Sequence, residues 1–161
     1  MKKKLMTLAV LLMAAVTMNA QSIIGMWKAD IPSNEYEIFM EFDESSQVSL
    51  VVAGDIKEED MSAKVYAGVH GTYKLDGSTL TFDINKKEPE IEIEDLKLSG
   101  ELEGKEEMVK SLLMKAMEAE QEELFSDLDF EKVTIVSLTD VTLEMKVEGD
   151  EKNVVFNKVL D

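Results

Sequence analysis

The chain has 161 residues, with 34 acidic side chains against 17 basic ones, and its formal net charge is −17. So acidic a chain is a poor partner for nucleic acid or an anionic membrane surface, because binding to phosphate needs clustered cations. It has no cysteine and a single histidine. Disulfides and metal sites built on thiolates or imidazoles are therefore excluded, and a Ser-His catalytic pair could use only His70.

The first 20 residues have the pattern of a cleavable signal peptide. Lysines at positions 2–4 precede an apolar run over 5–16, and Ala20 offers a small residue before a cut at Gln21. The apolar run is too short to span a membrane comfortably. We therefore predict an exported protein, periplasmic or secreted, with one mature domain over 21–161 and no transmembrane segment in it. Without the signal peptide, 14 basic residues face 34 acidic ones, a net charge of −20.

The first half of the mature chain alternates between apolar and polar residues, as half-buried β-strands do. The pattern predicts strands over 23–29, 35–43, 47–53 and 63–75, with a polar loop over 54–60. Phe39 breaks the alternation on the acidic face, where it is either an ordinary exposed residue or part of a contact surface. Gly68 and Gly71 interrupt the fourth strand, and glycine inside a strand often marks a bulge or a sharp bend.

The stretch GTYKLDGSTLTF over 71–82 carries the strongest hairpin signal, with Asp76-Gly77 as the turn between two alternating segments. The pattern then predicts a strand over 79–85, a loop over 86–89 and a strand over 90–98. The apolar phase changes within this last strand, which indicates a bulge near Glu94 and Asp95. Three further strands are predicted over 132–138, 141–147 and 153–160.

Residues 105–125 interrupt the strands with helical periodicity. Apolar residues recur there at spacings of three and four, which predicts an amphipathic helix with one buried stripe: Val109, Leu112, Leu113, Ala116 and Met117. We expect this helix to lie across one end of the sheet or against its outer wall, as a flank or a lid.

Eight or nine strands with one wet face must cover their other face, and a single helix is too little to do so. The sequence therefore predicts a mainly β fold, an antiparallel up-and-down β-barrel with one amphipathic α-helix inserted between strands. A two-sheet sandwich is the alternative.

Three segments resemble the lipocalin-like proteins of the calycin group, especially small secreted ones of Bacteroidetes-type bacteria. IIGMWK (23–28) is similar to their opening Gly-x-Trp strand, through Gly25 and Trp27. GTYKLDGSTLTF (71–82) and SLTDVTLEMKVEGDEKNVVFNKV (137–159) resemble their hairpin and closing strands. The resemblance implies a non-enzymatic barrel, although the helix departs from the typical member, in which it follows the barrel.

The candidate ligand-binding residues are the apolar side chains expected to face inward: Trp27, Tyr36, Ile38, Met40, Phe42, Val65, Leu80, Phe82, Ile84, Leu143 and Met145. An eight-stranded barrel is just wide enough to be filled by such side chains or to hold one small ligand. Aromatic and methionine lining suits an adaptable apolar pocket. The leading hypothesis is therefore a non-enzymatic protein that binds a small hydrophobic, lipid-like ligand.

The alternative is a filled barrel that acts as an interaction module of the cell envelope, with a basic protein partner. We predict no catalytic residue, cofactor or metal. His70 is expected to be an ordinary polar residue, and the acids alternate along strands without forming a calcium-binding loop.

Overall fold

The computed structural model describes residues 22–32, 36–126, 131–149 and 151–160, and the predicted signal peptide lies outside these ranges. Within them the chain forms eight strands, one short 3₁₀ helix and one α-helix. In chain order these are β1 (Gly25–Ala29), β2 (Tyr36–Phe42), β3 (Gln47–Glu58), β4 (Met61–Asp76), β5 (Thr79–Leu98), η1 (Gly100–Leu102), α2 (Glu106–Ser126), β6 (Lys132–Leu138), β7 (Thr142–Val147) and β8 (Asn153–Lys158).

The strands form one closed antiparallel ring. Each strand pairs with the next along the chain, and β8 returns to pair with β1. At this last seam Trp27 lies opposite Lys158 and Ala29 opposite Phe156. The predicted mainly β, antiparallel architecture with one helix between strands is confirmed, and the expected eight or nine strands are eight.

Two segments predicted as loops belong to strands. Residues 54–58 continue β3, because β4 supplies partners along its whole length, and the turn is Glu59-Asp60. Residues 86–89 lie within β5 as a wide bulge. There Glu90 pairs with Gly68 and Asn85 with His70, so four residues of β5 stand opposite a single residue of β4.

Smaller irregularities agree more closely with the sequence. The bulge predicted near Glu94 and Asp95 is confirmed by a register shift between β4 and β5, and Asp95 has a φ of 51°. The predicted hairpin turn is one residue out of place. Asp76 still pairs with Thr79, and the two turn residues are Gly77 and Ser78, with a φ of 61° at the glycine.

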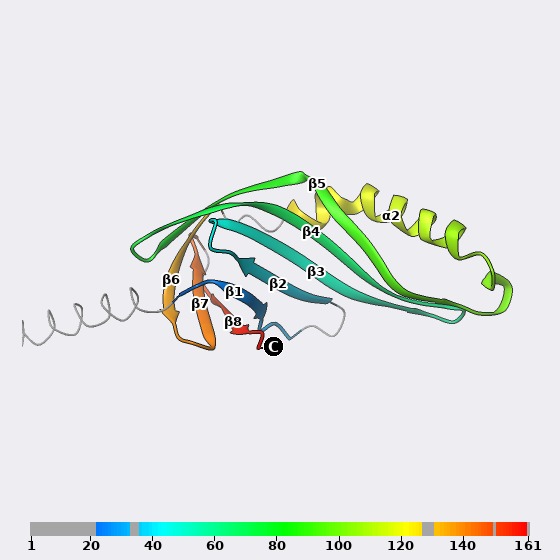
Figure 1. Cartoon of the computed structure of the whole chain (residues 1–161), viewed down its shortest axis with the longest axis horizontal. Coiled ribbons are helices and arrows are strands. Elements are labelled where there is room, and N and C mark those ends of the chain that lie inside the picture. Colours follow the sequence, from blue (N-terminus) through cyan, green and yellow to red (C-terminus); the bar gives the residue numbers. More distant parts are fainter. Residues whose placement is uncertain (1–21, 33–35, 127–130, 150, 161) are drawn as a thin grey trace, which may run out of the picture.

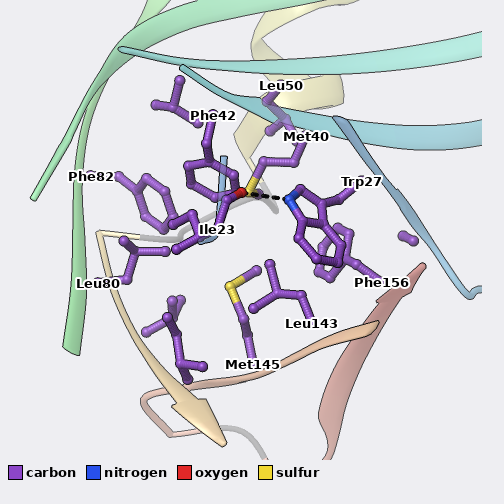
Figure 2. Close-up of a cluster of buried hydrophobic side chains, with 14 of the residues drawn as sticks. Ile23, Trp27, Met40, Phe42, Leu50, Leu80, Phe82, Leu143, Met145 and Phe156 are labelled. Atoms are coloured by element: carbon purple, nitrogen blue, oxygen red, sulfur yellow. Dashed lines mark hydrogen bonds between the residues drawn. The ribbon is translucent and has the colours of Figure 1, made fainter. Parts of the chain in front are cut away.

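The main hydrophobic core fills the closed part of the ring (Figure 2). Trp27 is fully buried there, and its indole N–H donates a hydrogen bond of 2.7 Å to the carbonyl oxygen of Ile23. That bond satisfies the only polar atom of the side chain, as burial requires. Phe42 packs edge-on against Tyr73, with 5.1 Å between the ring centroids.

β3, β4 and β5 are much longer than the other strands and project beyond the closed part, where α2 runs alongside them (Figure 1). A second apolar cluster, made of Ala63, Val65 and Ile93, lies on this projection. Leu113, Met114 and Met117 of α2 pack against it. Phe125, near the end of the helix, is buried in the main core. The helix thus covers the projecting strands and reaches into the ring.

Candidate functional site

Most of the predicted ligand-binding residues converge in the main core. Trp27, Met40, Phe42, Leu80, Phe82, Leu143 and Met145 are buried there together, and half-buried Ile38 and Ile84 pack against them. Two residues lie elsewhere. Tyr36, at the start of β2, is 45% exposed, and Val65 belongs to the second cluster beneath α2.

The converging side chains pack against one another. Trp27, Leu80 and Leu143 have no exposed surface, and Met40, Phe42 and Phe156 have almost none (Figure 2). Phe125 enters this core from α2, a contribution that the sequence pattern did not indicate. At these residues the interior is filled, as a small eight-stranded ring allows. Ligand-sized space lies at the surface.

A surface cleft with a volume of about 790 Å³ lies beside β5. We call it the first cleft, and its lining residues come from β4, from β5 and from the residue before β6: His70, Gly71, Thr72, Thr81, Phe82, Asp83, Ile84, Asn85, Lys86, Lys87 and Glu131. Its volume lies within the range of small-molecule sites, about 300–1,000 Å³. Two predicted ligand-binding residues, Phe82 and Ile84, are its apolar walls.

The pairing of the strands explains why the first cleft lies where it does. β5 pairs with β6 only over Thr79–Thr81, and one further bond runs at each end of this pairing: from the Phe82 N–H to the Glu131 carbonyl and from the Ile135 N–H to the Ser78 carbonyl. Beyond that point β5 continues past β6 toward α2 (Figure 1). Side chains of both faces of β5 line the cleft, since successive residues of a strand point to opposite faces. The cleft therefore wraps around the edge of β5 where it leaves β6.

The second cleft, of about 350 Å³, adjoins the first on the outer face of the ring. It is lined by Thr79, Lys132, Thr134, Lys146, Val147, Glu148 and Gly149. Thr81 of the first cleft pairs with Lys132 of the second, so the two clefts meet at the seam between β5 and β6. No α2 residue within the described part of the chain lines either cleft.

His70 lies at the first cleft in a row of hydrogen-bonding side chains across three strands. Its Nδ1 is 2.8 Å from Ser49 Oγ on β3, and its Nε2 is 3.3 Å from Glu90 Oε2 on β5. A carboxylate only accepts, so in the neutral ring Nε2–H donates to Glu90 and Nδ1 accepts from the Ser49 hydroxyl. Sequence reasoning missed this row, because only the register of β3, β4 and β5 brings its members together.

Ser-His-carboxylate rows are also the basis of nucleophilic catalysis. Here, however, Ser49 lines neither cleft, and Glu41 on β2 lies directly opposite it. Negative charge that develops on a substrate oxygen needs hydrogen-bond donors or cations beside it. An acidic neighbour opposes that charge, so the row is better suited to fixing the orientation of His70 at the cleft.

The two shifted pKa values lie at the turn between β2 and β3, outside the clefts. The N–H of Gln47 and the hydroxyl and N–H of Ser45 donate to the Asp43 carboxylate, and these bonds lower the pKa of Asp43. Partial burial raises the pKa of Tyr73, and the nearby charge of Asp43 adds to the rise. The Tyr73 hydroxyl donates to the Asp43 carbonyl oxygen at 2.9 Å.

Among the residues that the structure describes, no group of three or more histidine and acidic residues is arranged to hold a metal ion. None of the helices described is long and apolar enough to cross a membrane.

Comparisons with known proteins were made at three levels. No protein-family model matches the chain, and neither a curated protein nor a solved structure matches it.

Proposed function

We propose that this protein is an exported, lipocalin-like binding protein, without catalytic activity, that holds a small lipid-like ligand at the first cleft. The observation that carries the proposal is the cleft of about 790 Å³ with Phe82 and Ile84 in its lining. Its size suits a small molecule, and its apolar walls would retain part of the ligand by burial. The closed ring of eight antiparallel strands supports the lipocalin-like assignment.

The proposed ligand would bind at the surface of the ring and not inside it. Packed side chains occupy the interior, so the apolar part of the ligand would lie against Phe82 and Ile84 at the rim of the core. The polar part would face His70, Asn85 and the neighbouring lysines. A non-enzymatic role is supported by the position of Ser49, which lines neither cleft.

Titration with a fluorescent fatty acid tests the proposal. We expect saturable binding with one site per chain, weakened about tenfold or more in Asn85→Trp, because an indole at this exposed position would fill the cleft. Glu92→Trp is the matched control, since Glu92 is also exposed on β5 and lines neither cleft. Absence of saturable binding, or equal affinity of Asn85→Trp and the unmodified protein, would contradict the proposal.

The packed interior also favours a second candidate, an interaction module with a basic partner. Phe39, its expected contact residue, is half-buried, and Lys28 Nζ lies 5.8 Å from the centroid of its ring. Lys28 is also ion-paired with Glu37, so a contact surface at this point would present Phe39 beside a paired lysine and the acidic side chains of β2. A basic protein that binds here should bind more weakly as the salt concentration rises. Binding that does not depend on salt would count against an electrostatic contact.

A further inference from the structure

The surface that joins the two clefts is cationic, although the protein is strongly acidic. Strand register places two rows of residues on the outer face of β4–β7. One row is Lys74, Thr81 and Lys132, and the other is Asp76, Thr79, Thr134 and Lys146. We refer to the three lysines and three threonines of these rows as the lysine face.

Charge at the two clefts differs from charge in the whole chain. Four lysines line them, Lys86, Lys87, Lys132 and Lys146, against three acids, Asp83, Glu131 and Glu148. The whole chain has 34 acids and 17 bases. Lys74, Lys132 and Lys146 form no ion pair with any residue that the structure describes. Their charges are therefore not neutralised by a direct partner.

The spacing of the lysines suits one shared anion. Thr134 lies opposite Lys146, so Lys132, two residues before Thr134, is the diagonal neighbour of Lys146. Diagonal neighbours are about 7–8 Å apart at the backbone, within reach of long side chains. Thr134 adjoins both lysines, and Thr79 pairs with Thr134 from the β5 side. Both hydroxyls can donate hydrogen bonds to an anion's oxygen atoms.

Screening makes these near charges dominate over the distant acids. At physiological ionic strength the Debye length is about 8 Å, so exposed charges farther away contribute little. An anion between Lys132 and Lys146 would lie within that length of both ammonium groups. Acidic side chains also lie on this surface: Asp76 pairs with Thr79, Glu144 lies two residues before Lys146 on β7, and Glu131 and Glu148 line the clefts.

We infer that the ligand is an amphiphile with an anionic headgroup, and that the lysine face binds this headgroup while the first cleft holds the apolar part. This inference rests on the proposed function, because it assigns the chemistry of the same ligand. Charge-assisted hydrogen bonds from lysine to an anion are about twice as strong as neutral ones. The headgroup would thus select the ligand, and the tail would add affinity.

Three dodecyl compounds, used below their micelle concentrations, separate the two contributions. Dodecyl phosphate, dodecyl maltoside and dodecyltrimethylammonium carry the same tail with an anionic, a neutral and a cationic headgroup. By calorimetry we expect dodecyl phosphate to bind about tenfold more tightly than the maltoside, and its advantage to shrink as salt rises. The net charge of the protein alone would favour the cationic compound instead. Inorganic phosphate without a tail should not displace dodecyl phosphate at equal concentration.

Charge reversal locates the headgroup. Lys132→Glu combined with Lys146→Glu should abolish the preference for phosphate and leave binding of the maltoside unchanged. Lys110→Glu combined with Lys115→Glu is the matched control, because it makes the same charge change on the exposed face of α2. If the Lys132→Glu, Lys146→Glu variant does not fold, the Lys132→Gln, Lys146→Gln variant replaces it. We expect a smaller loss of the preference for phosphate in that variant.

The outcomes distinguish the inference from the proposed function. If no dodecyl compound binds, the proposed function fails. Equal binding of all three, tightest binding of the cationic compound or displacement by inorganic phosphate would overturn the inference while a binding site remains. A phosphate preference that survives reversal of Lys132 and Lys146 would overturn it as well.

Discussion

Gly71 is the residue with the least space in the hairpin formed by β4 and β5. A Cβ at this position would lie 2.1 Å from the carbonyl oxygen of Asp83 and 2.6 Å from the Cα of Ile84. Both obstacles are backbone atoms, so a side chain could be admitted only if the two strands moved apart. The sequence pattern indicated a bulge or a sharp bend at the strand glycines, and at Gly71 the structure shows instead a close approach of two strands, a further role of strand glycine.

Gly71→Ala should therefore lower the free energy of unfolding by about 3 kcal/mol or more, the upper part of the range for overpacking. Denaturant titration measures the change. Gly68→Ala, on the same strand, is the control, because its nearest contact would be the Val51 methyl at an ordinary 3.5 Å. Equal losses for the two variants would show that flexibility, and not the close approach, matters at Gly71.

Asp43 fixes the turn between β2 and β3 through its carboxylate. The N–H groups of Ser45 and Gln47 each donate to Oδ1 at 2.8 Å, and Ser46 between them has a φ of 65°. These donors hold the pKa of Asp43 below its ordinary value of 3.8. A lowered pKa in the folded state contributes stability above the unfolded value, and that contribution is lost as pH falls through the folded value.

Asp43→Asn should thus lower the melting temperature at pH 7, where the native carboxylate is ionised. The gap between the two proteins should begin to close once the pH falls below 3.8. Thermal unfolding monitored by circular dichroism from pH 7 to pH 2 checks this. Asp76→Asn, at the turn between β4 and β5, is the control for loss of an aspartate. A gap that stays constant down to pH 2 would assign the effect to geometry and not to charge.

The alternation along strands predicted most inward-facing residues correctly but misplaced Tyr36 and Val65. Alternation along the sequence shows which face of a strand a residue lies on. Whether the residue is buried depends on which element packs against that face. Tyr36 is the first residue of its strand and remains 45% exposed. Val65 lies on the projection, where the opposing element is α2 and not the ring. Neither distinction can be read from a local pattern.

At the scale of elements, α2 buries a narrower stripe than the sequence predicts. Val109 is buried and Leu113 and Met117 are half-buried, at a regular spacing of four. Leu112 is 60% exposed and Ala116 is exposed as well, contrary to the prediction. Met114 also packs against the second cluster, so the contact extends to one side of this line. Leu112 and Ala116, on its other side, remain in solvent.

Leu113→Asp should loosen α2 and cost about 2 kcal/mol, because it places a charge between the helix and the second cluster. We expect faster amide hydrogen exchange confined to residues 106–126. Probe binding at the first cleft should not change, because no described α2 residue lines it.

The neighbouring residue is the natural control. Leu112→Asp should change stability by no more than about 0.5 kcal/mol, as exposed substitutions generally do. Altered ligand kinetics in Leu113→Asp would show that the helix acts as a lid. Free exchange of 106–126 in the unmodified protein would show that the helix is not docked.

The lengths of β3 and β5 depend on pairing with a neighbouring strand and not only on the residues within each strand. Lys86, Lys87 and Pro89 have the composition of a loop, yet their segment stays in β5 because β4 continues beside it. The first cleft has the same origin, since it lies where β5 leaves β6. Periodicity predicted the apolar walls Phe82 and Ile84. It could not predict the polar residues beside them, which meet only through cross-strand register.

For the whole molecule, the main question is how a closed ring keeps its interior filled. The strands supply most of the packing, and Phe125, which is 1% exposed, adds an aromatic ring from α2. The helix therefore contributes to the core of the ring as well as to the projection. Without this side chain, the core would contain a void that the strand residues could not close by themselves.

Phe125→Ala should cost about 3–5 kcal/mol and leave an apolar cavity inside the ring. Such a cavity should bind benzene, as dry cavities of this kind do, whereas the unmodified protein should not bind it in the ring. Benzene-dependent shifts in melting temperature and in the NMR signals of core methyl groups test both statements. Phe125→Leu keeps most of the volume and should cost no more than about 1.5 kcal/mol. If Phe125→Ala lost no more stability than Phe125→Leu, the surrounding core would have collapsed into the space left by the ring of Phe125.

The seam between β1 and β8 determines when the protein can finish folding. β3, β4 and β5 are joined by tight turns, so they can pair as soon as they are made. β1, in contrast, has no partner for its second edge until β8 is available. Phe156, whose ring completes the core beside Trp27, lies on β8 (Figure 2). Contacts between such distant segments form slowly, so the folding chain would keep an open sheet with an exposed apolar face until β8 pairs with β1, and a variant without β8 could not close it.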